Sequence, residues 1–267
     1  MDSERAKPPA GGRIAVAAPM ILGRLPRRRA VALAASLAAL VAYCAVAPRL
    51  PEIRSAFDVV VQAALVLPFF TGAIWLALPL ARSRTIALLA LALGAGAGAL
   101  AFDLLGADSA GNIAKLACYA LVGFCFLTVF EELWWTALVA ALVPWVDIWS
   151  VAAGPTQYVV EQRPGIFDRV AVALPSFHDT STLSIGPPDV LFFALFLAAA
   201  DRFGLRVTAT WLAMTGLLAA TLVLVWAWRD VSGLPALPAI ALGFLAPNAD
   251  LVWRDVRRVR ARPTEPT

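Results

Sequence analysis

The sequence has few charged residues, one histidine and three cysteines, and each shortage excludes a class of protein. Charged residues make up 15% of the 267 residues, against about 25% in ordinary globular proteins, which is too few to cover a water-soluble surface. The single histidine, His178, excludes metal centres built from several histidines. All three cysteines lie inside apolar segments, so we expect no disulfide framework and no zinc site.

Apolar residues are abundant instead, and they come in blocks long enough to cross a membrane. Hydrophobic residues make up 61% of the chain, and a spanning helix needs roughly 20 mostly apolar residues. The sequence therefore predicts an all-α polytopic membrane protein with about eight transmembrane helices. The predicted spans cover approximately residues 30–47, 59–81, 85–102, 112–130, 133–153, 183–200, 207–228 and 234–252.

The distribution of Lys and Arg predicts the orientation of the chain in the membrane. Residues 1–29 form a basic N-terminal tail that we expect to be disordered, and residues 254–267 form a basic C-terminal tail. If both termini are cytoplasmic, that side carries 16 of the 22 Lys and Arg residues, in agreement with the positive-inside rule. The net charge of +4 then reflects membrane orientation and not nucleic-acid binding. The loop of residues 154–182 is predicted to lie outside.

Two aspartates stand out because they lie inside predicted spans, Asp147 in the fifth and Asp189 in the sixth. A carboxylate near the middle of a spanning helix costs roughly 2.5–3.5 kcal/mol on insertion scales, so two of them indicate a function. The remaining aspartates of the membrane part lie at segment ends, where we interpret them as solvated charges. They are Asp58, Asp103, Asp108, Asp201, Asp230 and Asp250.

Asp147 and Asp189 are predicted to lie at the same depth. Each is about six residues from the end of its span that flanks the 154–182 loop, which places both roughly 9 Å inside the outer face. Two facing carboxyl groups at low dielectric share one proton, and the pair then offers a general base and a general acid. Spacing alone leaves three interpretations open: a protease, a cation or proton transporter, and a structural pair.

Two further motifs accompany the aspartates. Gly186-Pro187-Pro188 precedes Asp189 and cannot be regular helix interior, and Pro235-Ala236-Leu237 opens the last span at the same outer face. Together with Val146-Asp147, these segments resemble the three motifs of the presenilin and signal peptide peptidase family of GxGD-type intramembrane aspartyl proteases, which are Tyr-Asp, Gly-x-Gly-Asp and Pro-Ala-Leu. The resemblance covers about residues 130–255 and suggests a prokaryotic presenilin-like homologue.

The resemblance implies a presenilin-like bundle with a four-helix N-terminal membrane part, residues 30–130, and a catalytic membrane part, residues 131–253. It implies an aspartic endopeptidase in which Asp147 and Asp189 activate water to hydrolyse peptide bonds in transmembrane substrate helices, without a cofactor. The residues that would shape the active site and bind substrate are Gly186, Pro187, Pro188, Pro235, Ala236 and Leu237. The expected partners are transmembrane peptides or proteins and the lipid bilayer, and the expected location is the cytoplasmic membrane.

The sequence departs from the family at three points. Val146 stands where the family has Tyr, Pro188 stands where it has the second Gly, and eight spans are predicted where members usually have nine. Because proline fixes φ, the turn before Asp189 is stiffer than a glycine turn. The alternative is a non-proteolytic relative that uses the aspartates as a cation or proton pathway or that binds membrane helices. Nothing in the sequence predicts the oligomeric state.

Short β segments are expected near the active site. In the 154–182 loop, the stretches Tyr158–Glu161 and Arg169–Leu174 alternate in polarity, which predicts that they pair as strands. A substrate helix must unwind before water can attack it, and its freed backbone groups then need new partners. Irregular backbone at Thr182–Ile185 and at Pro235–Leu237 is predicted to supply them by strand addition.

The orientation can be tested by labelling single cysteines in intact cells, in a variant that lacks Cys44, Cys118 and Cys125. We expect an impermeant thiol reagent to label a cysteine at position 178 and not one at position 260, because the 16-to-6 division of Lys and Arg places the termini inside. Labelling at position 260 without labelling at position 178 contradicts the predicted topology.

Overall fold

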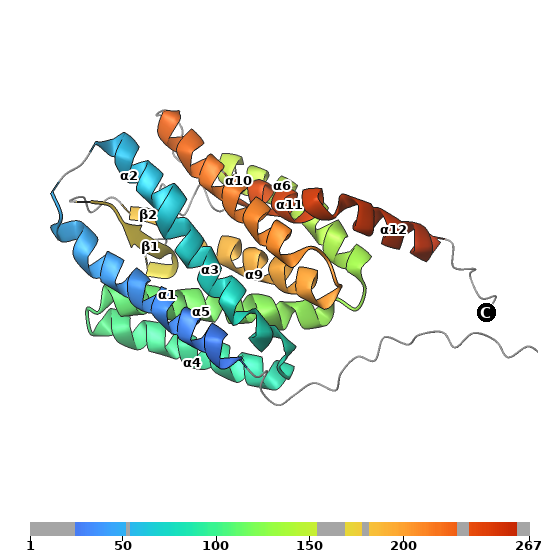
Figure 1. Ribbon diagram of the computed structural model, residues 1–267, viewed down its shortest axis with the longest axis horizontal. Helices are drawn as coiled ribbons and strands as arrows, with labels where there is room; N and C mark the ends of the chain where they lie inside the picture. Colours follow the sequence, from blue (N-terminus) through green and yellow to red (C-terminus); the bar gives the residue numbers. More distant parts are fainter. Residues whose placement is uncertain (1–24, 52–53, 154–168, 178–181, 229–234, 261–267) are drawn as a thin grey trace, which may run out of the picture.

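The computed structural model describes residues 25–51, 54–153, 169–177, 182–228 and 235–260, which form a bundle of helices with one two-stranded sheet towards one end (Figure 1). A π-helical turn at Gln62–Val66 joins α2 to α3, so that these form one long helix. The helices and strands are α1 Arg27–Val46, α2 Ser55–Val61, α3 Leu67–Ala77, α4 Thr85–Leu104, α5 Asp108–Phe126, α6 Leu133–Ala153, β1 Val172–Pro175, β2 Thr182–Ile185, α9 Pro187–Arg202, α10 Val207–Ala227, α11 Leu237–Leu245 and α12 Ala249–Arg260.

Within the described residues, six helical segments are long and apolar enough to cross a membrane, which confirms the prediction of an all-α membrane protein. They are Arg27–Arg49, Ser55–Arg82, Thr85–Leu104, Asp108–Val129, Leu133–Ser150 and Val207–Ala227, and they match the first five predicted spans and the seventh. Helices α9 and α11 are shorter, with 16 and 9 residues. The count of eight spans and the presenilin-like arrangement therefore stay predictions.

Helices α9 and α11 both begin later than predicted, and α11 also ends early, at Leu245. Residues 182–185 form β2 instead of the start of the sixth span, and α11 begins only at Leu237. Prolines occupy the first turns of both helices, where a missing N–H costs no helical hydrogen bond. The expectation of an irregular turn directly before Asp189 was wrong in one respect, since Pro187 and Pro188 already belong to α9.

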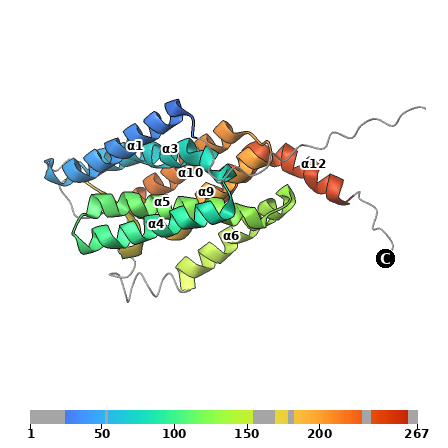
Figure 2. The same ribbon diagram turned by 90° about the horizontal axis from the view of Figure 1, so that it is seen from below.

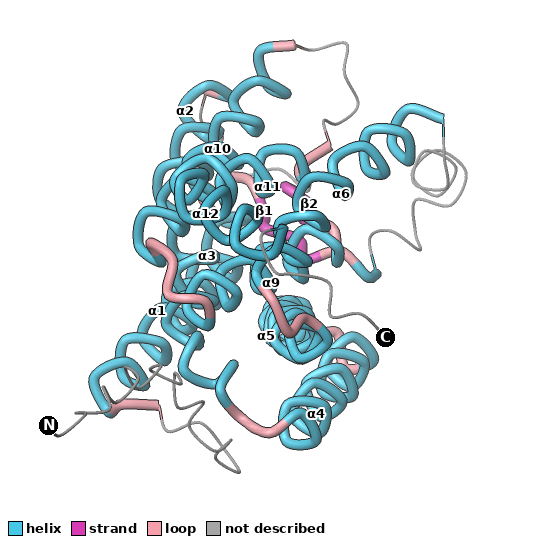
Figure 3. The backbone as a smooth tube through the Cα atoms, turned by 90° about the vertical axis from the view of Figure 1, so that its right-hand side faces the viewer, coloured by secondary structure: helices cyan, strands magenta, loops and turns pink. Residues whose placement is uncertain are grey.

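Helix α9 occupies the centre of the bundle, with α5 on one side and α10 and α11 on the other (Figure 3). Every residue from Phe193 to Ala200 is buried. A helix that is apolar around its whole circumference is suited to such a position. Because Asp189 lies in the first turn of this helix, the central packing of α9 carries that carboxyl group into the interior.

Two glycines allow neighbouring helices to approach closely. A Cβ atom on Gly123 of α5 would lie 2.4 Å from the carbonyl oxygen of Leu191 in α9. A Cβ atom on Gly243 of α11 would lie 2.5 Å from the Cα atom of Met214 in α10. The positions of α9 and α11 therefore depend on bare backbone at these two crossings.

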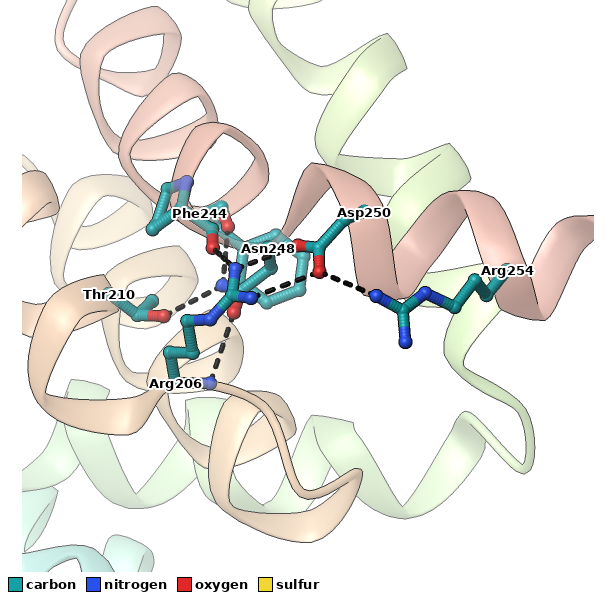
Figure 4. Close-up of polar contacts among 7 residues, drawn as sticks. Arg206, Thr210, Phe244, Asn248, Asp250 and Arg254 are labelled. Carbon is teal, nitrogen blue, oxygen red and sulfur yellow. Dashed lines mark hydrogen bonds and ion pairs between the residues drawn. The ribbon is translucent and has the colours of Figure 1, made fainter.

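The last predicted span is broken at Ala246–Asn248, after which α12 leaves the bundle and projects beyond it (Figures 1 and 2). Asn248 is fully buried at the break and ties it to α10: its amide nitrogen donates to Thr210 Oγ1 at 2.8 Å, and its amide oxygen accepts the Arg206 N–H at 3.0 Å (Figure 4). Asp250 accepts both ends of the Arg206 guanidinium and also pairs with Arg254. This cluster fixes the end of α11 that lies away from the aspartates.

The close crossing of α10 and α11 generates a test of the packing. Gly243→Ala should lower the free energy of unfolding by about 1–3 kcal/mol, because the new methyl group overlaps the Met214 backbone. Gly216→Ala in α10 is the matched control, since nothing lies within 4 Å of its Cβ position, and alanine favours a helix over glycine by up to about 1 kcal/mol. Thermal unfolding in detergent measures both, and equal effects of the two substitutions would contradict the close crossing.

Candidate active site

Asp189 lies at the N-terminal end of α9, directly after the sheet. The extended backbone at Gly186 caps the helix, and the N–H of Gly186 donates to Asp189 Oδ2 at 3.1 Å. In return the Asp189 N–H donates to the Gly186 carbonyl oxygen at 3.1 Å. The carboxylate is thereby held at the positive end of the helix dipole, which favours negative charge. A Cβ atom on Gly186 would lie 3.1 Å from Asp189 Oδ2, so glycine leaves this carboxylate its space.

Asp147 lies on α6, and its partner is the backbone of the Pro-Ala-Leu segment. The N–H of Leu237 donates to Asp147 Oδ2 at 3.1 Å. Leu237 is the first residue of α11, where the helix itself provides no acceptor for an N–H. Thr136 and Ala140 are completely buried on α6, and α6 packs along α11. Asp147 therefore accepts a hydrogen bond from a backbone N–H that has no partner within its own helix. This N–H belongs to the Pro-Ala-Leu segment, which was predicted to lie beside Asp147.

Helix α11 packs against both α6 and α9, which brings three motifs from distant parts of the sequence together. Asp147 lies six residues before the end of α6 and Asp189 lies in the first turn of α9, and both helices contact α11. In each carboxyl group, Oδ2 is held by a backbone N–H. The two Oδ1 atoms are then the ones suited to sharing a proton or holding a water molecule.

The other predicted site residues differ in how far they are exposed to solvent. Leu237 is buried, and Pro188 is exposed. Val146, where the resembled family has tyrosine, is 64% exposed on α6. Four further residues are half-buried: Gly186, Pro187, Pro235 and Ala236. All six predicted shaping residues thus lie at or next to the N-terminal ends of α9, which carries Asp189, and of α11, which contacts Asp147.

The sheet next to Asp189 was predicted only in part. Strand β1 overlaps the predicted stretch Arg169–Leu174 and pairs with β2. The other predicted strand, Tyr158–Glu161, lies outside the described residues. The strands are antiparallel, with Val172 opposite Ile185 and Pro175 opposite Thr182. Strand β2 was expected to be irregular backbone, and it leads through Gly186 directly into α9.

Sequence reasoning missed the polar side chains that hold this sheet. Asp58 was interpreted as a solvated charge, but it accepts the Phe177 N–H and a hydrogen bond from Gln62, which also donates to Ser176. Asp201 and Asp250 were interpreted in the same way and form ion pairs, with Arg82 and Arg206. For Gln62, the sequence did offer a signal, because an isolated polar residue inside an apolar span must find a partner there.

The described residues contain no group of three or more His, Cys, Asp or Glu side chains that could hold a metal ion. No protein-family model, no curated protein and no solved structure matches the chain. The resemblance to the presenilin and signal peptide peptidase family therefore rests on the residues of the motifs alone.

The bond from Leu237 to Asp147 generates a test that needs no knowledge of function. Asp147→Ala leaves the buried Leu237 N–H without its acceptor, which should cost about 1–3 kcal/mol of unfolding free energy. Asp147→Asn keeps a side-chain oxygen as acceptor and should unfold close to the unsubstituted chain. Thermal unfolding in detergent compares the two, and an alanine variant as stable as the asparagine variant counts against this hydrogen bond.

Proposed function

We propose that this chain is an intramembrane aspartyl protease that hydrolyses peptide bonds in transmembrane substrate helices, with Asp147 and Asp189 as its catalytic pair. The observation that carries the proposal is the convergence of the two aspartates and the Pro-Ala-Leu segment. Asp147 binds the Leu237 backbone, and Asp189 heads the central helix beside it. The motifs lie some 40 to 50 residues apart in sequence, on helices that all contact α11 or belong to it, and the resembled family uses the same combination.

The chemistry follows from two carboxyl groups that share one proton. The ionised carboxylate removes a proton from a water molecule, whose oxygen attacks the scissile carbonyl carbon. The protonated carboxyl group gives its proton to the carbonyl oxygen, so that a gem-diol forms and the pair again holds one proton. Collapse of the gem-diol breaks the C–N bond while a proton passes to the leaving amine. Two backbone donors, from Gly186 and Leu237, hold the carboxyl groups in place throughout.

The substrate must present an unwound peptide bond to the pair. In lipid a helix satisfies its own backbone groups, and unwinding leaves them without partners. We expect the unwound segment to regain hydrogen bonds at the β1–β2 sheet, because β2 ends one residue before Gly186 and four before Asp189. The predicted orientation of the chain is the same as that of signal peptide peptidase. This orientation favours substrates whose N-terminus is cytoplasmic.

Loss of either carboxyl charge should abolish cleavage and leave the fold intact. Asp147→Asn and Asp189→Asn each retain an oxygen that can accept the Leu237 or Gly186 N–H, but an amide cannot act as the general base. The assay incubates the purified chain in detergent or nanodiscs with a panel of transmembrane peptides, and mass spectrometry identifies the products. We expect product to fall by at least about a thousandfold, since removing one member of a catalytic unit removes most of its effect.

Asp103→Asn is the matched control, because Asp103 is an exposed aspartate on α4. It should cleave as the unsubstituted chain does. Appreciable cleavage by purified Asp189→Asn would falsify the catalytic assignment. Proton or cation flux through reconstituted vesicles that depends on both aspartates, without any cleavage, would instead identify the non-proteolytic alternative.

A further inference from the structure

Side chains of α1 and α5 bind main-chain groups of β1 and of the residue before it, on the side that faces away from β2. Main-chain groups of successive strand residues point to alternate sides of a strand. The Tyr43 hydroxyl donates to the Pro175 carbonyl oxygen at 2.7 Å, Asn112 Oδ1 accepts the Ala173 N–H at 3.2 Å, and Lys115 Nζ donates to the Ala171 carbonyl oxygen at 3.3 Å. These three contacts fall on every second residue, and therefore on one edge.

The contacts come from the N-terminal half of the chain. Tyr43 belongs to α1, and Asn112 and Lys115 belong to α5. Pro175 suits the same edge, because its nitrogen has no hydrogen that needs an acceptor. Asn112 is 8% exposed, so the bond to Ala173 is made away from water. At such a depth each unpaired backbone group is costly, which makes these side chains a requirement for a sheet in this position.

These three contacts also fix the position of β2, the strand that pairs with β1. Strand β1 is tied to helices on one side and to β2 on the other, in the register that sets Val172 opposite Ile185. One residue after Ile185 comes Gly186, whose N–H holds the Asp189 carboxylate. A displacement of β1 is therefore passed through β2 to the catalytic end of α9.

We propose that Tyr43, Asn112 and Lys115 are positioning residues, through which α1 and α5 hold the β1–β2 sheet as a rigid template that sets which substrate peptide bond meets the Asp147–Asp189 pair. The proposal rests on the proposed proteolytic function. It gives the N-terminal four helices a part in the reaction, although none of the three side chains touches a reacting atom.

The decisive variant is Asn112→Leu, which keeps the volume of the side chain and removes the acceptor of the Ala173 N–H. Asn112→Asp keeps an oxygen at this position and is the conservative variant. Tyr119→Phe is the control, because the Tyr119 hydroxyl donates at 2.7 Å to the carbonyl oxygen of Val170, two residues before β1, and binds no residue of the strand. All are studied as the full chain in nanodiscs.

Two measurements separate positioning from a merely structural role. In hydrogen–deuterium exchange, the segment around Ala173 should exchange about tenfold faster in Asn112→Leu than in the unsubstituted chain or in Asn112→Asp, because local opening becomes easier. With a transmembrane peptide as substrate, mass spectrometry should show one dominant cut replaced by several neighbouring cuts. The turnover number kcat should fall about tenfold, as expected when reacting groups are misplaced by a fraction of an ångström.

Asn112→Asp and Tyr119→Phe should both retain the dominant cut. Faster exchange at Ala173 with an unchanged set of products would overturn the proposal, since the hydrogen bond would then serve stability alone. Unchanged exchange would overturn it as well. Failure of the proposed function looks different: the unsubstituted chain then cleaves no peptide, and the template role falls with it.

Discussion

A backbone N–H or carbonyl group that is not paired within a helix or sheet must find a partner when water is absent, and the site of this protein is built from such partners. Helix α9 starts late, α11 starts late, and a two-stranded sheet lies between helices, so that orphan groups gather in one region. Asp189 takes the Gly186 N–H, and Asp147 takes the Leu237 N–H. The two carboxyl groups that we propose for catalysis are also the groups that satisfy the interrupted backbone.

The same constraint explains the polar residues that lie outside the catalytic pair. Asn112 accepts from the strand backbone, and Asn248 bridges α10 and the break at the end of α11. Glycines act in the complementary way, because Gly123 and Gly243 let backbones approach where a side chain would separate them. Polar partners at the interruptions and bare backbone at the crossings together hold α9 against α5 and α11 against α10.

The sequence predicted the long helices well because a run of about 20 apolar residues has few other uses. It also predicted that Asp147, Asp189 and Pro235–Leu237 share one level of the membrane, and the structure brings Asp147 to Leu237. The pairing of β1 with β2 was not predicted, because short stretches of alternating residues carry no information about which neighbour each will take. Asn112 and Gln62 escaped notice since their importance depends on a strand more than 60 residues away.

Helix α9 is shorter than the hydrocarbon core of a bilayer is thick, and its length sets the depth of Asp189 in the bundle. Its 16 residues extend about 24 Å, whereas the hydrocarbon core is about 30 Å thick. The end away from Asp189 is anchored, because Asp201 pairs with Arg82 and Arg202 donates to the Leu127 carbonyl oxygen. In the proposed protease, the length of α9 therefore sets the distance between this anchored end and the peptide bond that meets Asp189, at about 5.4 Å for each helical turn.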